Sequence, residues 1–129
     1  MIAASRARDR IARLDAICLA LPGATREDKG DHAIFCVRSR VFAYLMNNHH
    51  GDEIVSVSCK VLPGDAPRLV EGDASKYYLP AYIGSRGWVG LRLDRATVNW
   101  AEVKELVAGS HELTVLKKSA RRTGEPGRT

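Results

Sequence analysis

Aromatic and cationic side chains gather in one short stretch of this sequence, and such side chains can contact ligands through stacking or charge. The stretch covers sixteen residues and contains Tyr77, Tyr78, Tyr82, Trp88 and Arg92, with Arg86 in a turn. Exposed aromatic rings beside arginines can stack on nucleobases or hold an anionic ligand. The alternative is that the rings cover the second face of a sheet, because aromatic residues in strands mostly serve packing.

A second group of side chains superficially resembles a metal site. His49 and His50 are followed by Asp52 and Glu53, and His32 is a third histidine that a hairpin would bring near. Adjacent residues of a strand point to opposite faces, so two neighbouring histidines rarely bind one ion. The group also lacks the spacing of a helical or knuckle site. We therefore expect no metal and no cofactor.

The sequence contains no pattern that is typical of a catalytic centre. Cys18, Cys36 and Cys59 lie apart in apolar contexts, which predicts free, packed thiols in a reducing compartment. No serine has the G-x-S-x-G context of a hydrolase. The turn at residues 84–87 is rich in glycine but precedes a strand, so it lacks the helix N-terminus that binds phosphate. We expect a protein without enzymatic activity.

The net charge is +5, and most of it lies at the end of the chain. Residues 117–129 carry five basic residues and one glutamate, which leaves a net charge of only +1 for residues 1–116. The tail contains Lys117, Lys118, Arg121 and Arg122, with glycine and proline after them. Such a composition favours a disordered end that attracts polyanions without specific recognition. We expect one domain over residues 1–116 and a basic, disordered tail over residues 117–129.

No apolar run approaches the ~20 residues that a membrane span needs, and the charged N-terminus lacks a signal-peptide core. We expect a cytoplasmic protein with no membrane contact.

Hydrophobic periodicity predicts an α+β domain with the order helix, three strands, short helix, two strands, helix. The expected elements are a helix ending at Pro22, strands at 33–38, 41–46 and 54–60, a helix at 65–72, extended segments at 77–83 and 88–93, and a helix starting near Asn99. Asn99 and Glu102 have the spacing of a capping box, and Gly109 weakens or ends this last helix. Strands joined by hairpins indicate a two-layer fold, an antiparallel sheet of about five strands with helices on one face.

The run from Gly87 to Asp94, G-W-V-G-L-R-L-D, resembles the hallmark of the MmcQ/YjbR family of small bacterial proteins. The step Leu21-Pro22-Gly23 and the following hairpin also resemble that family, and the similarity covers about residues 10 to 119. The resemblance implies a two-layer fold related to type III secretion chaperones and frataxin-like proteins, a common DNA-binding label and no established catalysis. The matching positions are Trp88, Arg92, Asp94, Trp100 and Ser110. The chain departs from the pattern at His111, where an aromatic is expected, and at Val115-Leu116, where a proline often stands.

Our leading hypothesis is a non-catalytic, DNA-binding or transcription-associated protein whose partner is double-stranded DNA. Arg38 and Arg40 at a hairpin tip would form a wing. Further phosphate contacts would come from Arg86, Arg92, Lys117, Lys118, Arg121 and Arg122. Because DNA interfaces are strongly positive and this domain is nearly neutral, the hypothesis requires the basic side chains to cluster on one face.

The alternative hypothesis is a module that binds a small ligand or a protein on an aromatic sheet face. Its contacts would come from Tyr78, Tyr82, Trp88 and Arg92, in an apolar concavity containing one arginine. Arg92 has another interpretation, because Asp94 lies on the same strand face and would form an internal ion pair with it.

Overall fold

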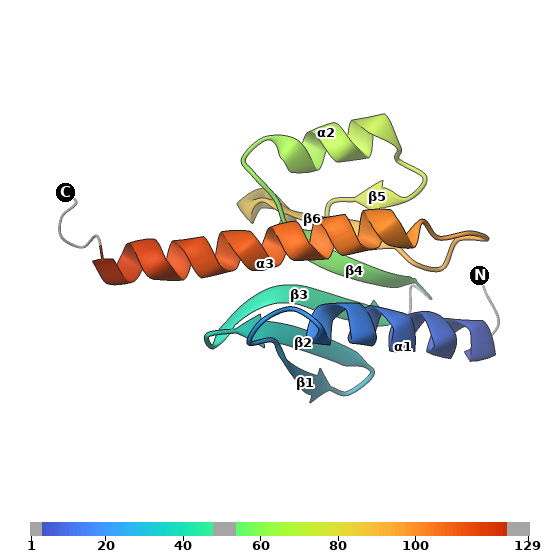
Figure 1. The fold of residues 1–129 in the computed structure, drawn as a ribbon. Helices are drawn as coiled ribbons and strands as arrows, with labels where there is room; N and C mark the ends of the chain where they lie inside the picture. The colour runs from blue at the N-terminus through green and yellow to red at the C-terminus, as the bar shows by residue number, and fades with distance from the viewer. Residues whose placement is uncertain (1–3, 48–53, 124–129) are drawn as a thin grey trace.

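The computed structural model describes the backbone of residues 4–47 and 54–123, with side chains to residue 116. In chain order the elements are α1 (Ala4–Leu19), β1 (Thr25–Lys29), β2 (His32–Val37), β3 (Arg40–Asn47), β4 (Val55–Lys60), α2 (Asp65–Gly72), β5 (Tyr77–Tyr78), the 3-10 turn η2 (Gly84–Arg86), β6 (Trp88–Arg92) and α3 (Trp100–Thr123) (Figure 1). The α+β class is as predicted, but the sheet has six strands where the sequence indicated about five.

The strands form one antiparallel sheet in the order β1-β2-β3-β4-β6-β5. The strand that the sequence analysis missed is β1, which runs along one edge. Its residues are Thr-Arg-Glu-Asp-Lys and all five are exposed, so it shows no hydrophobic alternation. Charged side chains on an edge strand are a common protection against pairing with other chains.

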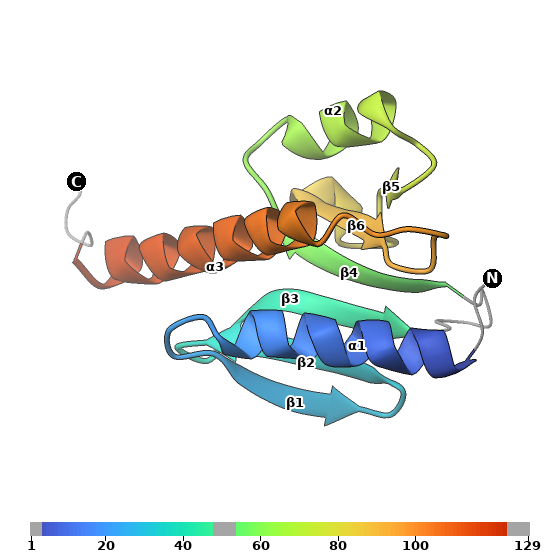
Figure 2. The ribbon, with the colours of Figure 1, turned by 45° about the vertical axis from the view of Figure 1, so that its right-hand side comes forward.

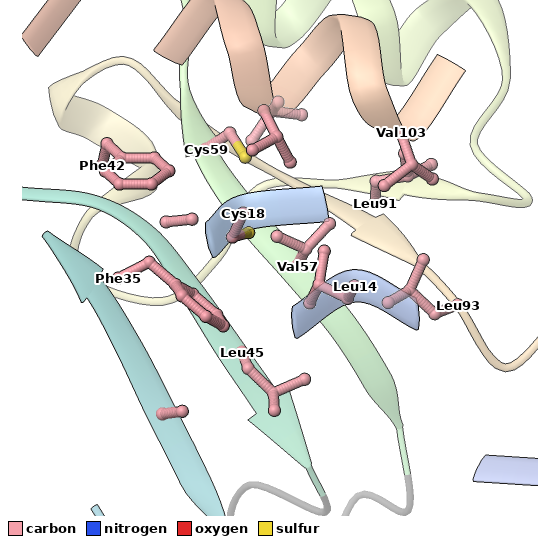
Figure 3. Close-up of a cluster of buried hydrophobic side chains, with 14 of the residues drawn as sticks. Leu14, Cys18, Phe35, Phe42, Leu45, Val57, Cys59, Leu91, Leu93 and Val103 are labelled. Atoms are coloured by element: carbon pink, nitrogen blue, oxygen red, sulfur yellow. The ribbon is translucent and has the colours of Figure 1, made fainter. Parts of the chain in front are cut away.

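Helices α1 and α3 lie side by side over one face of the sheet, while α2 lies near β5 (Figures 1 and 2). The core forms between these layers. Leu14 of α1 and Val103 of α3 meet Phe35, Val57 and Leu91 from three strands (Figure 3). All five are at most 3% exposed, so burial of this cluster fixes which face of the sheet the helices cover.

Two arginines of α1, Arg10 and Arg13, also anchor the helix. The Arg10 guanidinium donates to the backbone carbonyls of Leu93, 2.7 Å away, and Ala96, 3.1 Å away, and also to that of Arg95. The guanidinium carbon of Arg13 lies 4.8 Å from the centre of the Trp100 ring. Helix α1 is therefore tied to the segment that joins β6 to α3.

Helix α3 begins as predicted and extends further than predicted. The Asn99 side chain accepts a hydrogen bond from the Glu102 amide at 3.2 Å, which caps the first turn. Gly109 does not end the helix, because buried Val107 and Ser110 on either side hold it to the sheet. The helix continues through residues 117–123, where the sequence analysis began the disordered tail. Lysine, alanine and arginine are good helix formers, so this segment continues the helix readily. Residues 124–129 lie outside the described residues.

The extended segment predicted at 77–83 is a strand only at Tyr77 and Tyr78. Beyond it the chain turns at Pro80, which cannot donate to a sheet ladder. The turn is closed by hydrogen bonds from Gly84 N to Pro80 O at 2.9 Å and from Arg86 N to Ile83 O at 2.9 Å. As a result, residues 79–86 leave the sheet plane and form a folded loop before β6.

Within the described segments, no helix has the length and apolar character that crossing a membrane requires.

Candidate functional site

The β2–β3 hairpin presents its arginines through a two-residue turn. Arg38 and Ser39 have φ angles of 53° and 67°, the left-handed conformations of a tight hairpin turn that matches the twist of its strands. Arg38 is exposed at the tip, and Arg40 is half-buried where β3 starts. The hairpin that the sequence predicted around Arg38 and Arg40 is therefore present.

Arg40 lines a hollow of about 560 Å³ that we call the basic hollow. Its other lining residues are Ser39, Val41, Tyr44, Lys60, Ile83, Arg86, Trp88 and Thr114. With Arg40 included, three of the nine lining residues are cationic, and no aspartate or glutamate is among them. The basic hollow is thus electrostatically suited to an anion.

Strand pairing brings these distant residues together. Lys60 at the end of β4 lies opposite Trp88 at the start of β6, and β3 pairs with β4 on its other side. The positive φ of Gly87, 89°, turns the chain from η2 into β6 and so places Arg86 at the mouth. The rings of Tyr44 and Trp88 form one wall, with centroids 5.1 Å apart and planes inclined by 58°. Because Trp88 is only 9% exposed, it supports this wall and does not offer a free stacking face.

Helix α3 connects the basic hollow to the basic residues of the chain's C-terminal segment. Thr114 of α3 is part of its lining, and α3 continues from there through Thr123. The next turns of that helix carry Lys117, Lys118, Arg121 and Arg122. In Figure 1 the C-terminal part of α3 and the β2–β3 turn both lie at the left end of the molecule. Seven of the eight residues predicted to contact nucleic acid therefore lie on the β2–β3 hairpin, on η2 or on α3, which all contribute to the lining of the basic hollow, and we call this part of the molecule the basic end.

Acidic residues concentrate elsewhere in the described structure. A groove of about 550 Å³ between α2 and α3 contains four carboxylate residues and one lysine: Asp65, Glu102, Glu105, Glu112 and Lys60. Lys60 lines both this groove and the basic hollow, so the two adjoin, whereas Arg40 and Arg86 line only the basic hollow. The DNA hypothesis requires clustered basic side chains, and these three residues are the cluster that it would use.

The predicted aromatic residues divide between two places. Tyr78 and Tyr82 line a second hollow of about 490 Å³, which we call the aromatic hollow. It lies between the sheet face opposite α1 and α3 and the loop after β5, and its remaining lining is Tyr44, Met46, Ile54, Ser56, Ser58, Leu79, Pro80, Ala81 and Ile83. Tyr44 and Ile83 line both hollows, so the two are neighbours.

Gly90 determines how Tyr78 lies in the aromatic hollow. A Cβ atom at position 90 would be 2.4 Å from Cζ of the Tyr78 ring, so the ring occupies the space above the glycine. From there the Tyr78 hydroxyl shares a hydrogen bond with the Ser56 hydroxyl, 2.6 Å away. The glycine of the G-W-V-G-L-R-L-D run is therefore required by an aromatic ring on the neighbouring strand.

Arg92 lines neither hollow. Its Nε and one terminal nitrogen donate to the two carboxylate oxygens of Asp94, both at 3.0 Å, and the Asp94 side chain is 2% exposed. The internal ion pair is thus the interpretation that the structure supports. The expectation of an apolar concavity containing one arginine is not met by Arg92.

Other positions that match the family pattern also have structural roles. Ser110 donates to the carbonyl of Phe42 at 2.6 Å and accepts from the amide of Lys60 at 2.9 Å, which joins α3 to β3 and β4. His111, a departure from the pattern, packs edge-on against Phe42 with centroids 5.1 Å apart. Its Nε2 lies 2.8 Å from the Pro22 carbonyl oxygen. The histidine thus takes an aromatic packing position.

The metal-like group of histidines and acids lies in residues 48–53, outside the described residues, except for His32. Nδ1 of His32 accepts a hydrogen bond from the Asn47 amide at 3.1 Å, across the hairpin. Among the residues that the structure describes, no group of three or more metal-ligating side chains is present. Burial raises the pKa of Cys18 to about 12 and raises that of Cys59 well above its usual value. Both thiols are buried and packed, as their apolar contexts predicted, whereas Cys36, for which the same was predicted, is only half-buried.

The residues of the two hollows that sequence reasoning missed include Tyr44, Lys60 and Ser58. Each lies on a strand whose local pattern does not show what faces it. Their partners come from β6 and from the loop at residues 79–86, so strand order and loop path determine their role.

A model of the YjbR family matches residues 19–113 of this chain. The chain belongs to the YjbR family. A Deinococcus radiodurans protein with a DUF419 domain has a similar solved structure, with a TM-score of 0.69 and 24% sequence identity over 84% of this chain and 80% of its own. A structural-genomics target from Pseudomonas syringae gives a TM-score of 0.65 at 16% identity, over 81% of this chain and 97% of its own. At these identities the two structures support the fold alone. No curated protein matches this chain.

Proposed function

We propose that this protein binds nucleic acid through backbone phosphates at the basic end, and that binding is its function in place of catalysis. One observation carries the proposal. Arg40, Lys60 and Arg86 line a hollow without a carboxylate, and the helix that forms part of its wall continues into four more basic residues.

The chemistry of the basic end fits phosphates better than it fits base recognition in a groove. Arginine and lysine contacts to phosphate position a protein on the backbone without reading the sequence. Non-specific binding of this kind has a Kd of roughly 10⁻⁴–10⁻⁶ M at physiological salt, and it weakens steeply as salt rises. We therefore expect modest, salt-sensitive affinity for duplex DNA.

The alternative, a small-ligand or protein-binding module, has one observation in its favour. Tyr78 and Tyr82 do line a common hollow, whereas Trp88 supports the wall of the basic hollow and Arg92 pairs with Asp94. Because the aromatic hollow shares Tyr44 and Ile83 with the basic hollow, we treat the two as parts of one surface.

The test is the binding of a fluorescein-labelled DNA duplex, followed by anisotropy across a salt series. The variant pair Arg40→Gln and Arg86→Gln should weaken binding and reduce the slope of log K against log salt by about 1.8, since each phosphate contact contributes about 0.9. The control pair Arg8→Gln and Lys104→Gln removes the same charge from exposed positions outside the basic hollow. If both pairs change the slope equally, the basic hollow is not the contact site.

A further inference from the structure

The aromatic hollow contains a buried polar atom without a partner. Ser58 is 1% exposed, and its hydroxyl has no hydrogen bond to any residue that the structure describes. Two residues earlier on the same strand face, Ser56 has its partner in Tyr78. Buried hydroxyls are nearly always paired, so a ligand in the aromatic hollow would find at Ser58 an unused donor and acceptor.

The rim of the aromatic hollow carries an exposed ring on an unusual backbone. Tyr82 is 87% exposed and has a φ of 69°, in the left-handed region that residues other than glycine rarely adopt. Such conformations cluster at binding sites, where the surrounding structure holds them in place. Here the hydrogen-bonded turn from Pro80 to Arg86 holds Tyr82.

The turn from Pro80 to Arg86 contributes lining residues to both hollows. It places the ring of Tyr82 at the aromatic hollow and the guanidinium of Arg86, four residues later, at the basic hollow. Tyr44 lies between them, because it lines both. A ligand with an anionic group attached to a planar ring would therefore reach both hollows at once.

We propose that the two hollows form one site for an unstacked nucleotide of single-stranded nucleic acid. The phosphate lies in the basic hollow, near Arg86. The base lies in the aromatic hollow against the tyrosine rings, with its polar edge toward the Ser58 hydroxyl. This inference rests on the proposed function and adds to it a preference for single strands.

The preference follows from access to the base. In a duplex the bases are stacked and paired, so a base reaches a side hollow only after it leaves the helix at a cost. In a single strand an unstacked base is available to aromatic side chains and to hydrogen bonds along its edge. The aromatic hollow, at about 490 Å³, has the size of a small-molecule pocket and accepts one base.

The test compares three labelled probes by fluorescence anisotropy with the full chain. The probes are a 12-nucleotide single strand, a strand of the same length without bases, and the corresponding duplex. We expect the single strand to bind about tenfold more tightly than the other two, since each stacked base adds roughly that factor. Equal affinity for all three probes would overturn the inference.

Two variants locate the base. Tyr82→Ala, at an exposed position, should weaken single-strand binding about tenfold and leave the other two probes unchanged. Ser58→Ala should weaken the single strand in the same selective way. Leu19→Ala, an exposed apolar residue on α1, is the matched control and should change nothing. The inference is wrong if Tyr82→Ala leaves single-strand binding unchanged, or weakens the probe without bases equally.

Arg86→Gln separates this inference from the proposed function. If Arg86→Gln weakens the binding of all three probes while Tyr82→Ala has no selective effect, the phosphate contact is supported and the base site is refuted. If it weakens none of them, the proposed function itself fails.

Discussion

Replacing Gly90 by alanine tests the geometry on which the aromatic hollow depends. The added Cβ would meet three atoms of the Tyr78 ring at 2.4, 2.5 and 2.9 Å, all shorter than any van der Waals contact. The ring must move, because Gly90 lies in the interior of β6, paired with Ser58 on one side and Tyr78 on the other. Movement of the ring breaks its hydrogen bond to Ser56.

The expected cost is about 2 kcal/mol of unfolding free energy. Overpacking a buried site costs about 1–3 kcal/mol, and the lost hydrogen bond adds about 1 kcal/mol. Against this, alanine reduces the entropy of the unfolded chain and recovers about 0.5–1 kcal/mol. The first two contributions exceed the third, so Gly90→Ala should be clearly destabilising.

Urea unfolding of four proteins measures the effect and its cause: the wild type, Gly90→Ala, Tyr78→Ala and the double variant. Without the ring, the alanine at position 90 has room, so its cost should vanish in the Tyr78→Ala background. Gly109→Ala is the control, because a Cβ there meets nothing within 4 Å; in mid-helix it should stabilise the protein by about 0.5–1 kcal/mol. The argument is refuted if Gly90→Ala is neutral, or if it costs the same with and without the Tyr78 ring.

Two further predictions concern buried groups outside the hollows. Ser110→Ala should lower the unfolding free energy by about 2 kcal/mol in the same urea assay, because it leaves a buried carbonyl and a part-buried amide unpaired. A loss below about 1 kcal/mol would show that water replaces the hydroxyl. Iodoacetamide should label half-buried Cys36 in the folded protein, and label Cys18 and Cys59 only after unfolding, since burial raises the pKa of both thiols and blocks access. Peptide mass spectrometry checks this, and early labelling of Cys59 would contradict the packing described here.

Local patterns predicted the elements whose neighbours lie close in sequence. The capping residue Asn99 and the hairpin turn at Arg38 depend on contacts within a few residues, and both have the predicted role. The sequence of β4 alternates Val55 and Val57 with Ser56 and Ser58, and Val57 lies on the buried helix side. Both serines are buried as well, because the loop after β5 covers the opposite face, and no local pattern indicates this. Burial on the second face depends on a segment about twenty residues away.

Only part of the candidate site could be predicted from the sequence. Arg40 and Arg86 were recognised from charge and turn context, and both line the basic hollow. Lys60 was not recognised, because only the pairing of β4 with β6 brings it to the same place. Arg92 has the charge of a phosphate contact, but an aspartate two residues later engages it. Residue type indicated which side chains could contact a phosphate. Strand register decided which of those side chains lie together in one hollow.

The residues that show family membership support the proposed site but do not supply its cations. Trp88 supports a wall, and Ser110 joins α3 to the sheet. The cations come instead from a hairpin, a strand end and a 3-10 turn, namely Arg40, Lys60 and Arg86. A protein can therefore share the fold and the G-W-V-G-L-R-L-D run while lacking the cations. Similarity of fold to the two solved structures consequently does not transfer nucleic-acid binding in either direction, and each relative must be judged by the charges that line its own hollow.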